Sequence, residues 1–284
     1  MSARVDAYLG RRVVDRVMTA LSAFAVGLAL LPLVAILAYV TMRGASALSP
    51  ALFTELPEPG TGGGGIANAV VGTLELVGLA SLMGIPVGIL AGLFRAEYRA
   101  TLLARAVRFS ADVLAGVPSI LVGVVVYATV VVLMGRFSGL AGAVSLAVLM
   151  QPLVTRTTDE LARTVPDSLR EAAIALGAPR WRIALQVVLR TAAPGIRAGT
   201  MLAVARVCGE TAPLLFTAFD NDFWAKTPLE PTSTMQVRIF FYTLSPRDDR
   251  HAQAWAAALV LLALVMALHL LARRLDGAAR RKAP

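Results

Sequence analysis

Long apolar stretches run through almost the whole of this 284-residue sequence. Six of them approach or exceed the ~20 residues that a helix needs to cross the core of a lipid bilayer. Charged residues make up only 16% of the chain, whereas about 25% is usual in a soluble domain. We therefore predict an all-α membrane protein with six transmembrane helices, at residues 17–41, 68–94, 111–134, 138–155, 196–219 and 252–272.

The basic residues are distributed unevenly along the chain. With the N-terminus placed in the cytoplasm, twenty of the 27 lysine and arginine residues fall in predicted cytoplasmic segments. Cytoplasmic loops of membrane proteins carry such an excess of positive charge. The net charge of +9 therefore indicates orientation, with both termini cytoplasmic, and does not indicate a nucleic-acid-binding surface. We expect the chain to be a multi-pass protein of the plasma (inner) membrane.

The predicted spans divide the chain into segments. The first apolar run is too long for a signal peptide and no small-residue cleavage site follows it, so it should stay as an anchor. Cys208 is the only cysteine, which excludes an intrachain disulfide. The segments are a cytoplasmic tail 1–16, an anchor helix 17–41, an extracytoplasmic loop 42–67, a transmembrane domain 68–272 with a cytoplasmic loop 159–195 and an outer loop 220–251, and a basic tail 273–284.

The loop 42–67 is rich in proline and glycine. Pro57, Pro59 and the run Gly62 to Gly65 predict irregular structure. The glycines could cradle a phosphate, or they could form a flexible lead into the second span. No Gly-Lys-Ser/Thr follows here or elsewhere, so a nucleotide-binding P-loop is excluded.

The cytoplasmic loop 159–195 predicts two short helices. Thr164 can cap the first, Pro166 and Asp167 suit its start, and Gly177 closes it before Pro179 begins the second. The pair could lie flat in the membrane interface or form a knob that binds a soluble partner. Apolar residues recur on one face of the first helix at helical spacing: Leu169, Ala172, Ala173 and Leu176.

Two charged residues interrupt the predicted fifth span. Arg206 and Glu210 are four residues apart and share a helix face, and Arg206 would lie about 15 Å deep, near the middle of the core. Pro213 should bend the helix beside them, and Gly209 lets another backbone come close. The pair could be a salt bridge that locks two helices, or it could line an anion pathway, because an arginine fork matches phosphate oxygens.

Other residues inside the spans have simpler interpretations. Gly84, Gly88 and Gly92 repeat every four residues around Pro86 and predict a ridge for close helix packing. Glu75 is a lone acidic residue in the same span. The two histidines, His251 and His269, have no spacing typical of a metal site, and we expect no metal ion.

The cytoplasmic loop also resembles a known family. Glu171, Ala172 and Ala173, then three residues, Gly177 and a group at Val187 to Leu189, resemble the EAA signature of ABC-importer permeases. The signature normally ends in Leu-Pro, whereas here Arg190 follows Leu189 and the proline comes at Pro194. The resemblance implies that this loop docks onto a cytoplasmic ATPase.

Four longer motifs narrow the resemblance to phosphate-import permeases of the PstA type: "GGIANAVVGTLEL" (64–76), "GVPSILVG" (116–123), "TVPDSLREAAIALGAP" (164–179) and "GETAPLLFTA" (209–218). The match runs in order from about residue 42 to residue 274. It implies a type I ABC importer permease fold and inorganic phosphate as substrate, with Arg206 and Glu210 on the pathway. Arg156 is a second pathway candidate, although it could equally be a positive-inside anchor.

The resemblance also implies partners. They are a PstC-type permease that forms a heterodimer with this chain, an ATPase dimer that uses ATP and Mg, and an extracytoplasmic phosphate-binding protein. The chain itself should bind no cofactor. The outer loop 220–251 mixes aromatic with polar residues, which suits a transient protein interface, and we expect it to contact the binding protein or to close an outer gate. Its aromatic residues include Trp224, Phe240, Phe241 and Tyr242.

Three other functions can be compared with the sequence. An intramembrane hydrolase or transferase would need a nucleophile with a base, or a metal site, and the corresponding motifs are missing. A membrane scaffold or phosphate sensor without transport is a second possibility. A permease for another oxyanion, such as sulfate or molybdate, is a third.

Overall fold

The computed structural model describes residues 2–58 and 64–280. These residues are mostly helical and contain no β-strand, and an isolated antiparallel bridge joins Pro57 to Gly64. The helices are α1 (Ser2–Ala45), α2 (Pro50–Thr54), α3 (Ala67–Glu97), α4 (Leu102–Gly116), α5 (Ser119–Val126), the π-helical turn η1 (Tyr127–Val131), α6 (Val132–Met134), α7 (Gly139–Arg163), α8 (Asp167–Ala175), α9 (Arg180–Arg182), the π-helical turn η2 (Ile183–Val188), α10 (Leu189–Val207), α11 (Ala212–Thr217), α12 (Met235–Thr243) and α13 (Asp248–Arg280).

Four helices in the described part of the chain are long and apolar enough to cross a membrane. They are α1 from Val14 onward, α3, α7 and the first part of α13, up to Leu271. A fifth crossing is obtained if α4 and the segment Ser119–Met134 count as one span, although they are bent by 107°. The structure therefore differs from the prediction at the third and fifth predicted spans.

The third predicted span, 111–134, is wrong as a straight helix. α4 ends at Gly116, and Val117 has the extended values φ −73° and ψ 129°. The residue before a proline is pushed out of helical geometry. Pro118 is the N-cap of α5, which begins at Ser119. The chain therefore turns sharply in the middle of the predicted span.

The fifth predicted span, 196–219, is also wrong as one helix. α10 begins seven residues earlier, at Leu189, and ends at Val207. The chain resumes a helix only at Ala212, where Pro213 occupies the first turn of α11. Proline is tolerated there because N–H groups in the first turn of a helix have no partner within the helix, so the N–H that proline lacks is not needed. We expected a bend at this proline and find a break in the helix before it.

The loop 42–67 is more regular than expected. α1 continues to Ala45, and α2 forms inside the loop. The hydroxyl of Ser49 accepts a hydrogen bond from the amide of Leu52, and Pro50 fits the first turn of α2. Pro59, Gly62 and Gly63 lie outside the described residues.

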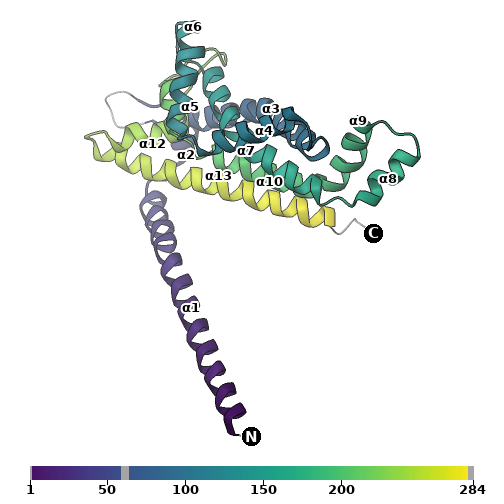
Figure 1. Cartoon of the computed structure of the whole chain (residues 1–284). Helices are drawn as coiled ribbons and strands as arrows, with labels where there is room; N and C mark the ends of the chain where they lie inside the picture. The colour runs from purple at the N-terminus through teal and green to yellow at the C-terminus, as the bar shows by residue number, and fades with distance from the viewer. Residues whose placement is uncertain (1, 59–63, 281–284) are drawn as a thin grey trace.

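The centre of the molecule is the pair of long helices α3 and α7, which pack side by side with α10 against them (Figure 1). Their contact depends on glycine. A Cβ atom added to Gly84, Gly88 or Gly92 would lie 3.1, 2.8 and 2.6 Å, respectively, from the nearest atom of α7. Small residues allow this close approach, and the two backbones come within contact distance.

We expect Gly92→Ala to destabilise the fold by about 1–3 kcal/mol, since the new methyl group would overpack this contact. Its Cβ would lie 2.6 Å from the carbonyl oxygen of Thr155. Gly78→Ala is a matched control on the same helix, because nothing lies within 4 Å of its added Cβ. Thermal unfolding of the purified protein should show a lower midpoint only for the first variant. Equal midpoints would contradict the packing role.

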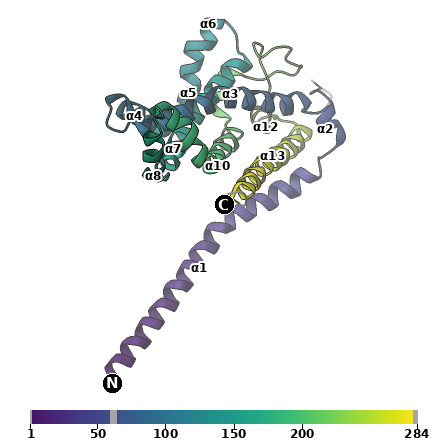
Figure 2. The same cartoon turned by 90° about the vertical axis from the view of Figure 1, so that its right-hand side faces the viewer.

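α1 and α13 lie on one side of this core. The ring of Tyr39 meets that of Trp255 edge-on at 5.1 Å, which joins the C-terminal part of α1 to α13. The N-terminal half of α1 projects away from the other helices in both views (Figures 1 and 2). α8 and α9 lie at one end of the bundle and α12 lies at the other (Figure 1). We call these the α8 end and the α12 end.

Candidate functional site

The break between α10 and α11 is held by buried polar groups. The carbonyl of Cys208 accepts a hydrogen bond from Nε2 of Gln236 on α12. The amide oxygen Oε1 of Gln236 lies 3.5 Å from Oγ1 of Thr73 on α3. Both side chains are buried, where satisfied polar networks specify one arrangement. The end of α10 is therefore fixed to two other helices.

Two of the sequence motifs meet at this break. Gly123 lies in the motif 116–123 and Pro213 in the motif 209–218. A Cβ atom on Gly123 would lie 2.6 Å from Cα of Pro213. α5 and α11 thus pack backbone to backbone, which only a residue without a side chain permits.

Arg206 and Glu210 lie at the break, and their contact is loose. Nε of Arg206 is 4.0 Å from Oε1 of Glu210, and the two side chains are 65% and 19% exposed. Neither forms an ion pair with another helix among the described residues. Arg206 was expected in the middle of a helix, whereas it lies one residue before the end of α10. Gly209 is in the break itself, and a Cβ there would have ample space.

Arg156 lies on α7 and points away from the protein core. Its Nε is 3.1 Å from Oε1 of Glu160, and these side chains are 67% and 64% exposed. An exposed pair at this spacing contributes little to stability. The structure shows no ion pair between Arg156 and either Arg206 or Glu210 in the described part of the chain.

Sequence reasoning missed a buried ion cluster at the α8 end. Nη2 of Arg95 on α3 lies 3.1 Å from Oδ2 of Asp159 on α7, and Nε of Arg163 lies 2.8 Å from Oδ1 of the same carboxylate. We had placed Arg95 and Asp159 in loops because the spans were expected to end at residues 94 and 155. The helices continue to Glu97 and Arg163, so the charges meet between them.

The segment of α8 and α9 is fixed at its base by Arg170, which sequence reasoning also missed. Nε of Arg170 is 3.1 Å from Oε1 of Glu97 on α3. Its two terminal nitrogens donate to two backbone carbonyls. One belongs to Ala162 in the last turn of α7, and the other to Val165, just after the end of α7. A guanidinium satisfies unpaired carbonyls at a helix end well. One side chain thus joins α8 to both α3 and α7.

The expected cap of the first loop helix is wrong. Thr164 ends α7, where its hydroxyl donates to the carbonyl of Leu161. α8 begins at Asp167 after Pro166. The reason is the length of α7, which runs to Arg163 and takes Thr164 as its C-terminal cap.

The knob, defined as residues 167–188, exposes its signature residues. Glu171 and Ala172 are exposed, Ala173 is half-buried, and no residue of α8 is buried. Gly177 ends the helix with a φ of +78°, a conformation that favours glycine. The knob also presents large apolar side chains to its surroundings, namely Ile174, Leu176 and Trp181.

At the α12 end, a buried arginine holds the loop between α11 and α12. Nη1 of Arg238 lies 2.5 Å from Oδ1 of Asp222, and Nη2 lies 3.0 Å from Oδ1 of Asp220. Nη2 also donates to the carbonyl of Asn221 and to Oγ of Ser233. Spacing in the sequence gives no signal for this cluster, since its members come from a loop and a helix.

The aromatic residues of the outer loop do not form one surface. Trp224 and Phe240 are exposed, but Tyr242 is 2% exposed. Residues 235–243 form α12, which turns Tyr242 inward beneath the guanidinium of Arg238, 5.4 Å from its ring centroid. The expected surface is therefore smaller than the sequence suggested.

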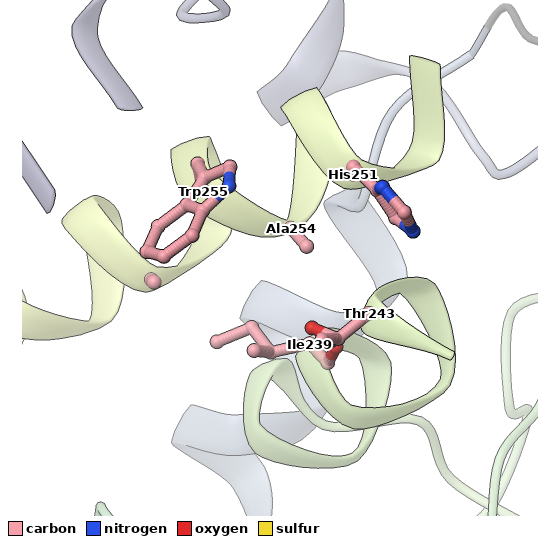
Figure 3. Close-up of a pocket in the computed structure, with 6 residues that line it drawn as sticks. Ile239, Thr243, His251, Ala254 and Trp255 are labelled. Carbon is pink, nitrogen blue, oxygen red and sulfur yellow. The ribbon is translucent and has the colours of Figure 1, made fainter. Parts of the chain in front are cut away.

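A cavity of about 310 Å³ lies between α12 and α13 (Figure 3). Ile239, Trp255 and His251 line it, and His251 Nε2 is 2.7 Å from the carbonyl of Ser245. This contact anchors His251 within the chain. Among the described residues, no group of three or more histidine, cysteine, aspartate or glutamate side chains is arranged to hold a metal ion.

Comparisons with known proteins place the chain in a family. A family model described as "Binding-protein-dependent transport system inner membrane component" matches residues 84–281. The phosphate transport system permease protein PstA of Yersinia pestis is 43% identical over 96% of this chain and 93% of its own length. PstA of Haemophilus influenzae is 41% identical over 93% of this chain and 94% of its own length.

A solved structure shows the same fold. A chain of the bacterial alginate ABC transporter, crystallised with an alginate-bound periplasmic protein, has a TM-score of 0.68 at 17% identity. The match covers 92% of this chain and 94% of that one. The fold is therefore that of an ABC importer permease. With the family match and the two relatives, the chain belongs to the binding-protein-dependent transport system inner membrane components, and within them to the PstA family of permease proteins.

Proposed function

We propose that this chain is the transmembrane permease subunit of an ATP-driven importer that moves inorganic phosphate into the cytoplasm. The observation that carries the proposal is the exposed guanidinium of Arg206 beside the helix break. The names of the relatives, which are phosphate transport system permease proteins, support phosphate as the substrate.

The proposed topology has six crossings with both termini in the cytoplasm. α1, α3, α7 and α13 supply four, the bent segment 102–134 supplies one, and α10 with α11 supplies one. The basic residues support this orientation because most of them flank the cytoplasmic ends. The membrane is then the plasma (inner) membrane.

Arg206 supports an anion pathway on physical grounds. A charged side chain facing lipid near the bilayer centre costs at least about 2.5–3.5 kcal/mol, yet Arg206 is 65% exposed in the isolated chain. It must therefore face water or another protein chain. We place it on a pathway between this subunit and a PstC-type permease, where its fork binds phosphate oxygens.

Glu210 completes this pathway site. A guanidinium with no competitor would hold phosphate tightly, and permeation requires that the ion can also leave. The 4.0 Å spacing allows the carboxylate to approach Arg206 after phosphate departs. Arg156 is the second pathway cation in this proposal, toward the cytoplasmic side.

The knob is the proposed contact with an ATPase dimer. Its apolar side chains are not covered by other described residues. The residues proposed to contact the ATPase lie on this anchored segment, namely Glu171, Ala172, Ala173 and Gly177. The ATPase would supply ATP hydrolysis with Mg, since the chain has no nucleotide-binding motif. The loop between α11 and α12 is the proposed contact with an extracytoplasmic phosphate-binding protein.

Transport by the reconstituted complex tests this function. Vesicles that contain both permease subunits and the ATPase should accumulate labelled phosphate when ATP is inside and loaded binding protein is outside. Labelled sulfate and molybdate should not accumulate. Uptake of either of these ions in place of phosphate would assign another oxyanion. Signalling without any uptake would indicate a phosphate sensor.

A further inference from the structure

A charged cavity lies at the α8 end of the bundle, between α3, α4 and α7. Its volume is about 280 Å³, and seven charged side chains line it. Four are arginines, namely Arg95, Arg108, Arg156 and Arg163. Arg206 and Glu210 are not among the residues that line this cavity.

Ion pairing leaves positive charge in the cavity. Asp159 is the carboxylate partner of both Arg95 and Arg163, at 3.1 and 2.8 Å, so two guanidiniums share one negative charge. Arg156 is balanced by Glu160. With Arg108 and Asp112 included, the four arginines and three carboxylates that line the cavity leave a net charge of +1, which favours an anion there.

Arg95 has spare donors. The residue is 6% exposed, and its Nε and Nη1 have no hydrogen-bond partner in the described part of the chain. A buried donor without a partner is unfavourable. These two donors are therefore available to an anion in the cavity, while Nη2 stays paired with Asp159.

Arg108 approaches the cavity from α4. It is exposed and forms no ion pair with a described residue. Asp112, one turn further along α4, also lines the cavity and opposes an anion there. α4 exposes Leu102 and Phe109, and such apolar residues suit contact with lipid.

We propose that this cavity binds a phosphate group between Arg95 and Arg108. Guanidinium forks bind phosphate oxygens with strong, charge-assisted hydrogen bonds. The group could belong to free inorganic phosphate or to the headgroup of an anionic lipid beside α4. In the proposed function, this cavity would be the last binding site that phosphate occupies before its release into the cytoplasm. That role of the cavity rests on the proposed function.

Equilibrium binding to the purified complex tests this site. The complex, in nanodiscs of phosphatidylcholine, carries Arg206→Gln to silence the pathway site and is titrated with inorganic phosphate. Adding Arg108→Gln should weaken binding about tenfold, as expected for one charged hydrogen-bond donor. Adding Asp112→Asn should strengthen it by about fivefold, because one repulsive charge is removed. Arg105→Gln, on the same helix but outside the cavity, is the control and should change nothing.

Phosphatidylglycerol in the nanodiscs distinguishes the two sources. If the lipid headgroup occupies the site, this lipid should displace phosphate, whereas a site for free phosphate should be unaffected. Either result supports the cavity. The inference is overturned if Arg206→Gln alone abolishes all phosphate binding, or if Arg108→Gln and Asp112→Asn leave binding unchanged. Failure of phosphate uptake with normal binding would count against the proposed function alone.

Discussion

Replacing Arg206 with glutamine should reduce phosphate uptake by about 10- to 100-fold while the complex still assembles. The size follows from the loss of a charged hydrogen-bond donor to the transported anion, about 1.5–3 kcal/mol. Assembly should survive because the side chain is 65% exposed and its only ion pair, among the described residues, is 4.0 Å long. Uptake into vesicles and the yield of folded complex are the two measurements.

Glu210→Gln should act differently from Arg206→Gln. The guanidinium then has no competing carboxylate, so phosphate should bind more tightly and leave more slowly. Uptake should fall through a lower maximal rate, with no increase in the phosphate concentration needed for half-saturation. A rise in that concentration would contradict the role given to Glu210.

The double variant separates a pathway pair from a structural bridge. Breaking a fully buried pair on one side costs about 3–5 kcal/mol, and matched neutral residues at both positions would then restore folding and transport. An exposed pair contributes about 0–1 kcal/mol, so we expect all three variants to fold and the double to remain inactive. Recovered transport in the double variant would make the pair structural.

The sequence predicted the central helices well because their signals are local. Apolar length identifies α1, α3, α7 and α13, and the four-residue glycine repeat identifies the side of α3 that meets α7. The two helix breaks, after α4 and after α10, also had local signals in the sequence. We gave more weight to the apolar length of the two segments. Gly116 and Pro118 stand inside the third predicted span, and Gly209 and Pro213 inside the fifth.

The ion clusters could not be predicted in the same way. Arg95 and Asp159 are 64 residues apart, and they meet only because α3 and α7 extend beyond their apolar cores. Arg238 gathers carboxylates from a loop whose path no periodic pattern describes. Charges at helix ends are informative only once the helix ends are known.

The knob illustrates how structure changes the reason for a prediction. The position of Gly177 between two short helices suggests by itself that a bulky side chain there would block the turn. Nothing lies within 4 Å of a Cβ added there, so a larger side chain would meet no other part of this chain. Two other effects oppose a larger side chain at this position. The positive φ of +78° costs roughly 1–2 kcal/mol for most residues, and the side chain would project toward a docked ATPase.

Gly177→Arg should therefore abolish transport coupling in a complex that still folds. Arg170 fixes the base of the knob to α3 and to the end of α7, so the strain stays local. We expect ATP hydrolysis that no longer responds to loaded binding protein, and uptake close to background. Gly177→Asn is the matched control, because asparagine tolerates the left-handed conformation and carries a short side chain.

The control separates the two causes, and Gly177→Ala completes the comparison. If side-chain projection prevents docking, arginine should be far worse than alanine and asparagine, which should both keep most of the coupling. If backbone strain is decisive, alanine should fail with arginine while asparagine is spared. Normal uptake and stimulated hydrolysis in Gly177→Arg would show that the tip of the knob does not dock onto the ATPase, because a charged side chain of that length cannot be accommodated unnoticed at a packed interface.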